Sequence, residues 1–232
     1  MASSLKKQYR KTTAFFLGHL PGKIGLKFRK IHRRHTPSAS MADLQAALAA
    51  SEGKLCIDLG ANIGEISKIM AKQASTVYAF EPDPWTAEQL RKNLISINNV
   101  EVVEAAVGVE DSTISMYRHN DFESDQITSS QSTSTFADKT NIDLNNAIEV
   151  QQIDFVRFLA DLNTDIGVIK MDIEGSEVAV LNALLEAPIL NRIDYIFVET
   201  HEKRIPDLEI PIDKLFRKVR KLKRPIINLN WY

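Results

Sequence analysis

Short apolar segments alternate with segments of helical periodicity along most of the chain, and this alternation limits the folds open to it. The apolar segments carry few polar residues, as expected for strands whose two faces are both covered by helices in a parallel sheet. The predicted strands are 54–59, 76–80, 100–106, 168–171, 193–198 and 226–229, and the predicted helices are 41–50, 64–74, 84–97, 153–162, 176–185 and 211–223. This βαβ repetition predicts an α/β fold with a doubly wound, mostly parallel sheet.

The segment Asp58–Gly64 joins the first predicted strand to the helix that follows it. Such a junction lies at the carboxyl edge of the sheet, where doubly wound folds bind their ligands. Gly60 and Gly64, with Ala61 and Asn62 between them, allow a sharp turn and a close approach of the backbone to a ligand. Asn62 stands where the dinucleotide fingerprint has its second glycine, so the spacing is not that of a dinucleotide site.

Two acids give this junction a charge that discriminates between nucleotides. Asp58 would repel a pyrophosphate by about 4 kcal/mol at ~4 Å and an effective dielectric of ~20, whereas it would attract the ammonium of a methionine moiety. Glu81 ends the second strand, where a carboxylate can accept hydrogen bonds from both ribose hydroxyls. We therefore predict a site for S-adenosylmethionine, which also includes Pro82 and Ala106.

Three segments together resemble the FkbM family of methyltransferases: Asp58–Gly64, Ala79–Pro84 and Ile169–Glu177. The segments 90–93 and 198–201 also agree with that family, and the resemblance covers roughly residues 53–204. It implies a Rossmann-like class I methyltransferase fold, S-adenosylmethionine as the donor, and O-methylation of hydroxyls on sugars, lipids or polyketides. The first 40 residues lie outside the resemblance. The single strand after the last helix also differs from the terminal hairpin that is usual in this fold.

Acids follow the fourth predicted strand, where the acceptor of a methyl group would lie. Transfer to an alcohol needs collinear oxygen, carbon and sulfur atoms and a base for the hydroxyl proton, and such a base contributes ~10²–10⁴-fold. Asp172 ends the strand and is predicted to be this base or to orient the acceptor; the alternative is a cap on the following helix. Glu174 is a further catalytic candidate, although the helix dipole alone would favour an acid there.

Glu199 and His201 end the fifth predicted strand two residues apart, so their side chains share a face if the strand persists. A histidine with a near-neutral pKa could relay the proton, with Glu199 orienting its ring; the alternative for His201 is an imidazole in a surface loop. Asp172, Glu199 and His201 would converge at one edge of the sheet. A divalent-cation site is the alternative for this group, but because the spacing of these residues matches no metal-ligand signature, we predict no metal site.

The first 40 residues contain ten Lys or Arg and no acid, in a chain whose net charge is −1. We treat 1–40 as a basic arm and 41–232 as the methyltransferase domain. The arm is predicted to be a partly ordered segment or helix packed on the domain; the alternatives are contact with an anionic membrane surface or polyanion, and a transit peptide. A single cysteine, Cys56, and no apolar run near the ~20 residues that span a bilayer predict a cytoplasmic protein, with peripheral membrane contact as the alternative.

The polar stretch 119–147 follows a predicted short hairpin at 114–117, and we expect it to shape the acceptor pocket. The predicted acceptor is a small molecule or a glycan. One alternative is an RNA methyltransferase that uses the arm and the basic residues of 214–224. The other is a non-catalytic module that binds a nucleotide without chemistry.

Overall fold

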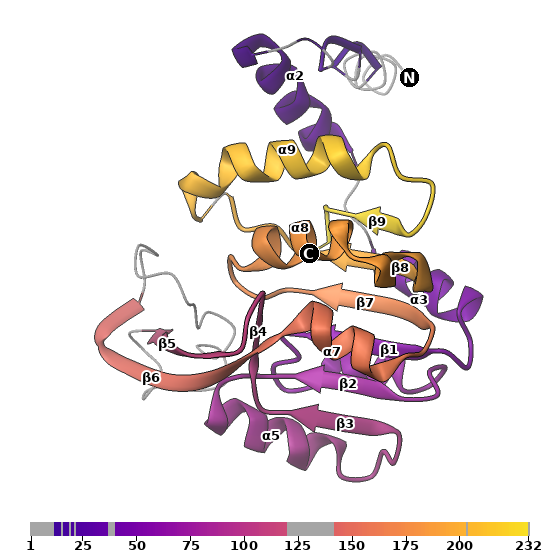
Figure 1. The fold of residues 1–232 in the computed structure, drawn as a ribbon, viewed down its shortest axis with the longest axis vertical. Coiled ribbons are helices and arrows are strands. Elements are labelled where there is room, and N and C mark those ends of the chain that lie inside the picture. The colour runs from indigo at the N-terminus through magenta and orange to yellow at the C-terminus, as the bar shows by residue number, and fades with distance from the viewer. Residues whose placement is uncertain are drawn as a thin grey trace, which may run out of the picture.

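The computed structural model describes residues 12–14, 16–18, 20, 22–36, 40–119, 142–202 and 204–231. Its central sheet has six strands in the order β3-β2-β1-β7-β8-β9, and each neighbouring pair is parallel (Figure 1). The strands are β1 (Leu55–Leu59), β2 (Val77–Phe80), β3 (Val100–Val103), β7 (Ile166–Met171), β8 (Ile193–Val198) and β9 (Ile226–Asn228). The predicted doubly wound, mostly parallel α/β fold is confirmed.

Helices cover both faces of this sheet, and β1 shows how its sequence divides between them. Leu55, Ile57 and Leu59 belong to one core cluster with α7 (Phe155–Leu162), α8 (Glu177–Glu186) and α9 (Glu209–Val219). Cys56 belongs to the opposite cluster with α3 (Met41–Ala50) and α4 (Glu65–Met70). Successive side chains of a strand point to opposite faces, so β1 is apolar throughout because both faces are buried.

Helix α5 (Pro84–Leu94) begins where its sequence supplies two start signals. Pro84 is the first helical residue, where its missing N–H costs nothing. The Asp83 carboxylate accepts hydrogen bonds from the backbone N–H of Thr86, at 2.9 Å, and from its hydroxyl, at 3.1 Å. This capped start fixes the turn after β2, and that turn carries Glu81.

A second, three-stranded sheet lies beyond the carboxyl ends of the central strands (Figure 1). Its order is β4-β6-β5, with β4 at Ala106–Gly108, β5 at Ser112–His119 and β6 at Ile142–Asp154. The sequence did not predict β6, and residues 142–147 are strand rather than polar loop. Ala106 belongs to β4 rather than to the end of the third strand, because the chain leaves the central sheet after Val103. Residues 120–141 of the polar stretch lie outside the described residues.

At the carboxyl end of the chain, β9 adds to the edge of the sheet parallel to β8. Trp231 follows it, donates its backbone N–H to the Val198 carbonyl at 3.2 Å and packs edge-on against Phe197, with 5.6 Å between ring centroids. The predicted single strand at 226–229 is therefore present, and within the described residues it closes this edge together with a buried tryptophan.

Part of the basic arm forms α2 (Gly22–His35), which lies against α9 (Figure 1). Arg29 is buried and contacts Asp213 of α9 with 2.5 Å between Nε and Oδ1. Lys30 also pairs with Glu209, at the first residue of α9. Some of the positive charge of the arm is therefore used inside the protein; residues 1–11 of the arm lie outside the described residues. None of the helices in the described part of the chain is long and apolar enough to cross a bilayer.

The thiol of Cys56 offers a simple check on the packing of β1. Cys56 is 1% exposed, and burial raises the pKa of its thiol to about 11 from an ordinary value of 9.0. Because the thiolate is the reactive form, this shift alone should slow reaction with a disulfide reagent about 100-fold in the native protein. The measurement compares thiol titration before and after unfolding in guanidinium. Equal rates in the two states would show that Cys56 is not buried.

Candidate functional site

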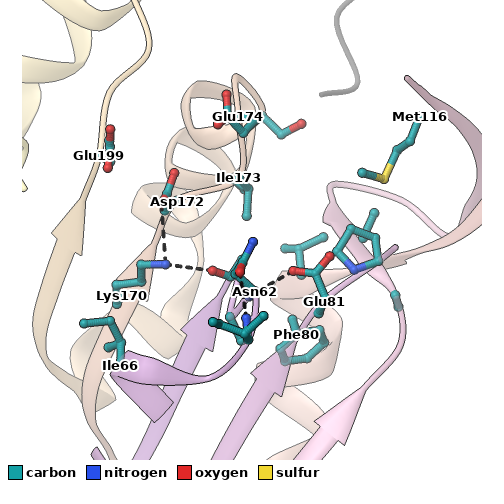
Figure 2. Close-up of a pocket in the computed structure, with 18 of the residues that line it drawn as sticks. Asn62, Ile66, Phe80, Glu81, Met116, Lys170, Asp172, Ile173, Glu174 and Glu199 are labelled. Carbon is teal, nitrogen blue, oxygen red and sulfur yellow. Dashed lines mark hydrogen bonds and ion pairs between the residues drawn. The ribbon is translucent and has the colours of Figure 1, made fainter. Parts of the chain in front are cut away.

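A cavity of about 360 Å³ opens at the carboxyl ends of β1, β2, β7 and β8, between the central sheet and the second sheet (Figure 2). Six predicted cofactor residues and three predicted catalytic residues lie in its wall: Gly60, Ala61, Asn62, Glu81, Pro82 and Ala106, and Asp172, Glu174 and Glu199. The other three predicted residues, Asp58, Gly64 and His201, are not among those that line it. The topology thus collects most of the predicted residues around one space of a size typical for small-molecule sites.

The turn after β1 forms one wall, and its backbone N–H groups are all used inside the protein. Those of Gly60 and Ala61 donate to the Phe80 carbonyl, those of Asn62 and Ile63 donate to the side chains of Glu81 and Asn62, and that of Gly64 donates to the Ala61 carbonyl. Phosphate sites at strand–helix junctions depend on free N–H groups that point at the ligand. The turn therefore offers no such cradle, which disfavours a pyrophosphate.

The two glycines of the turn are required by contacts within the protein. Gly60 has φ +75°, and a Cβ there would lie 1.9 Å from the carbonyl oxygen of Asp172. Gly64 has φ +94°, and its Cβ would lie 2.7 Å from the Leu90 side chain of α5. We expected both glycines to allow close approach of a ligand. The structure shows that they also allow close approach of Asp172, the residue after β7, and of α5 to the turn.

Asp58 corrects a second expectation, because its carboxylate is fully buried behind the cavity wall. Its Oδ2 accepts a hydrogen bond from the Ser67 hydroxyl of α4 at 2.7 Å, and its Oδ1 lies 3.4 Å from Nζ of Lys170. Asp58 is on the strand face that α4 covers, and Lys170 is its direct neighbour in β7. The charge of Asp58 is therefore balanced inside the protein and does not face a ligand.

Lys170 of β7 links the glycine turn to the acid that follows β7. Its Nζ donates to the Gly60 carbonyl at 2.8 Å and lies 3.6 Å from Oδ2 of Asp172 (Figure 2). Burial opposes the charge of Lys170, but Asp58 and Asp172 outweigh it and raise the pKa of the amine. Lys170 is thus a fixed cation at the base of the cavity.

Glu81 is held at the end of β2 with both oxygens oriented. Its Oε2 accepts from the backbone N–H of Asn62 and its Oε1 from that of Asp83, each at 3.0 Å (Figure 2). Burial raises the pKa of Glu81 to about 8, although these two hydrogen bonds favour the ionised form. The side chain is therefore a rigid acceptor whose charge changes near neutral pH.

Asp172, Glu174 and Glu199 lie on the other side of the cavity from Glu81 (Figure 2), and Nε2 of His201 lies within 4.0 Å of an oxygen of each of these three acids. Burial and the charge of Asp172 raise the pKa of Glu199. For His201, burial alone would lower the pKa, but the hydrogen bond to Glu177 and the charges of Glu177, Glu174 and Asp172 outweigh it and raise the pKa to about 9. This differs from the near-neutral pKa that we expected, because sequence did not show how many acids surround the ring.

Glu177 is a buried residue outside the predicted site that contacts His201 directly. It is fully buried, accepts hydrogen bonds from the backbone N–H groups of Ile173 and Gly175, and has its Oε1 2.7 Å from Nδ1 of His201. It therefore holds both the loop after β7 and the imidazole. In that loop Glu174 has φ +52°, a left-handed conformation that is uncommon outside glycine.

Other cavity residues carried no signal in the sequence. Met116 comes from β5, whose position above the cavity depends on the second sheet. Arg204 follows β8 and lies 3.4 Å from Glu174, an ion pair between segments 30 residues apart. Only the fold brings these two side chains to the site.

The carboxyl edge of this Rossmann-like sheet, where such folds bind their ligands, combines three features: a buried acid after β2, a glycine turn whose N–H groups donate within the protein, and a group of acids after β7 and β8. The sequence matches the family described as the methyltransferase FkbM domain over residues 58–223. The chain belongs to this family, and membership of a methyltransferase family supports the predicted cofactor, S-adenosylmethionine. No curated protein matches it by sequence.

Three solved structures share parts of the fold at low identity. The FkbM methyltransferase of Methylobacillus flagellatus KT is 14% identical, with 94% of this chain and 54% of that chain covered and a TM-score of 0.44. SMU.1697c of Streptococcus mutans, a putative methyltransferase in complex with SAH, is 11% identical, with 82% and 85% covered and a TM-score of 0.41. An rRNA methylase of Streptococcus thermophilus is 17% identical, with 31% and 42% covered and a TM-score of 0.28. The chain thus spans about half the length of two of these proteins, and the similarities do not identify an acceptor.

Proposed function

We propose that the protein transfers a methyl group from S-adenosylmethionine to a hydroxyl oxygen of a sugar, lipid or other small acceptor. The observation that carries the proposal is the division of one cavity into two ends. Glu81 stands at one end as an oriented acceptor for hydroxyl groups, and Asp172 and Glu174 stand at the other. S-adenosylmethionine with its ribose bound at Glu81 would direct its methyl group toward Asp172 and Glu174.

The walls of the cavity suit the donor in three ways. Phe80, Pro82, Val107 and Met116 supply apolar surface that an adenine ring could pack against. Glu81 is placed to accept hydrogen bonds from the ribose hydroxyls. Five carboxylates and two basic side chains line the space, which favours a positively charged sulfonium nucleoside over an anionic nucleotide. From the sequence, the preference for a cationic nucleoside depends on the charge of Asp58. In the structure this preference depends on the acids that line the cavity instead.

At the acceptor end, the reaction needs a site for the hydroxyl proton. The acceptor oxygen forms a bond to the methyl carbon while the carbon–sulfur electron pair returns to sulfur. The hydroxyl proton passes to a carboxylate, for which Asp172 and Glu174 line the cavity. His201 is expected to be protonated at neutral pH, so it stabilises negative charge rather than accepting the proton.

Replacement of Glu81 by Ala tests the donor end. We expect the variant to lose measurable binding of S-adenosylhomocysteine by calorimetry, because both ribose hydroxyls lose their acceptor. Glu104→Ala is the matched control, since it removes an exposed acid just after the neighbouring strand β3. Retained binding in Glu81→Ala would contradict the assignment, and no binding by the wild-type protein would contradict the proposed function.

The pKa of Glu81 also predicts a pH dependence. The ribose hydroxyls donate to the ionised carboxylate, while below about pH 8 the empty cavity holds it protonated. Binding must then expel a proton, so affinity should rise about tenfold per pH unit from pH 6 and level off above pH 8. The suitable ligand is 5′-methylthioadenosine, which has the ribose but no group that titrates in this range. A flat profile would show that Glu81 does not bind the ribose.

An RNA acceptor gains no specific support from the described residues. Arg217 and Arg29 share Asp213, and Lys218 pairs with Glu186, so part of the basic surface is neutralised by the protein's own acids. Contact of the arm with an anionic membrane or polyanion stays a prediction. Steeply salt-dependent RNA binding would favour the alternative acceptor.

A further inference from the structure

The acidic end of the cavity contains a group of side chains with the spacing of metal ligands. Asp172, Glu199 and His201 each offer one ligand atom, and these atoms lie within 4.8 Å of one another. Nε2 of His201 is 3.5 Å from Oδ1 of Asp172 and 4.0 Å from Oε1 of Glu199. Ligand atoms at right angles on a cation with bonds of ~2.1 Å lie about 3 Å apart, so small side-chain rotations would close the site.

The second observation is the buried, unpartnered nitrogen of His201. Its side chain is 2% exposed, and Nε2 has no hydrogen-bond partner among the described residues. The separations of 3.5 and 4.0 Å exceed the 2.7–2.9 Å of a charge-assisted hydrogen bond, so neither carboxylate satisfies Nε2. A buried polar atom without a partner is costly, and a cation among these atoms would satisfy it.

The other ring nitrogen is held in the way that metal-binding histidines usually are. Nδ1 lies 2.7 Å from Oε1 of the fully buried Glu177. Glu177 is itself fixed by the backbone N–H groups of Ile173 and Gly175. A carboxylate that accepts the Nδ1 proton aims Nε2 at the oxygens of Asp172 and Glu199, and a cation that displaces the Nε2 proton would complete the carboxylate–histidine–metal arrangement. Lys170 contacts the other oxygen of Asp172, Oδ2, and leaves Oδ1 for a ligand.

We propose that Asp172, Glu199 and His201 bind one divalent cation of the Mg²⁺ or Mn²⁺ type, with Glu177 as a positioning residue. Two carboxylates and one imidazole, beside an open cavity that leaves room for water or substrate, suit these ions. This site revises the prediction of no metal, which was based on sequence spacing, because the ligands come together only across β7 and β8.

The role of the cation in catalysis rests on the proposed function. A hydroxyl oxygen bound to a divalent cation loses its proton more readily. The acceptor oxygen then forms the bond to the methyl carbon, the carbon–sulfur pair returns to sulfur, and the proton passes to Glu174. Glu174 lines the cavity with its Oε2 3.5 Å from Nε2 of His201, and it is not one of the three ligands.

The test is titration of the full chain with Mn²⁺ alone, followed by the loss of the free-ion electron paramagnetic resonance signal. We expect saturation at one ion per chain, and nitrogen coupling from the His201 ring in the spin-echo spectrum of the bound ion. Asp172→Asn and Glu199→Gln change partly exposed side chains, so the fold should persist, and each should weaken Mn²⁺ binding at least about tenfold. Glu177→Gln should weaken it about 10- to 100-fold.

Glu65→Gln is the matched control, because it removes a cavity acid outside the cluster and should leave Mn²⁺ affinity unchanged. No uptake by the wild-type protein, or equal uptake by Asp172→Asn and Glu199→Gln, would overturn the cation site. Calorimetry with S-adenosylhomocysteine on the same samples separates the two proposals. Nucleoside binding without Mn²⁺ binding would sink only the cation site, whereas Mn²⁺ binding without nucleoside binding would sink only the proposed function.

Discussion

The Asp172→Asn variant is expected to lose methyl transfer by about 10²–10⁴-fold in kcat while it keeps its affinity for the donor. The carboxylate lies in the cavity wall between Lys170 and His201, on the other side of the cavity from Glu81, which is the proposed hydrogen-bond acceptor of the ribose hydroxyls. Asparagine keeps the size of the side chain, and the backbone carbonyl that packs against Gly60 is unchanged. The loss should therefore come from the missing charge.

The measurement is transfer of labelled methyl to the sugar, lipid or other hydroxyl acceptor that the wild-type protein modifies. Donor affinity is measured in parallel by calorimetry with S-adenosylhomocysteine. Glu104→Gln, an exposed acid just after β3 and outside the cavity wall, is the control. Unchanged turnover in Asp172→Asn would rule out a catalytic role for Asp172, and a parallel loss of donor affinity would assign it to the donor end instead.

Breaking the buried pair of Asp58 and Lys170 should produce the largest loss of stability. Both side chains are almost fully buried, and Lys170 bridges β1, β7 and the glycine turn. Removal of one partner of a buried pair typically costs about 3–5 kcal/mol, because it leaves a charge without compensation. At roughly 2–4 °C per kcal/mol for a chain of this size, Asp58→Ala should melt about 6–20 °C below the wild type.

The double variant Asp58→Leu/Lys170→Met distinguishes two causes of the lost stability, an uncompensated buried charge and a packing defect. It removes both charges and keeps apolar volume, so it should recover most of the lost free energy of unfolding. Glu88→Ala breaks an exposed pair with Lys92 in α5 and should leave the melting temperature nearly unchanged. Thermal and urea unfolding followed by circular dichroism provide the values. A double variant as unstable as the sum of the single ones would show that packing, not charge, dominates at this position.

The local pattern of the chain was sufficient to predict the central sheet and nine of the residues that line the cavity. Apolar segments and helix start signals both act over a few neighbouring residues. The apolar segment 193–198 forms β8, and α5 begins at Pro84, directly after its N-cap Asp83. Because parallel strands end at one edge, acids that follow β2, β7 and β8 had to lie near one another. The FkbM resemblance agreed with the family match over 58–223.

What each side chain does at that edge depended on contacts between distant segments. The direction of Asp58 follows from the strand face that α4 covers, and the pKa of His201 follows from three acids on two elements. The second sheet brings Ala106 and Met116 to the cavity through β6, which the sequence did not predict. Sequence alone therefore determined the order along the chain of the strands and helices of the central sheet, and the edge where the chemistry lies. Only tertiary structure decided which charges face the ligand and which neutralise each other, because electrostatic interactions depend on distance and burial rather than on separation along the chain.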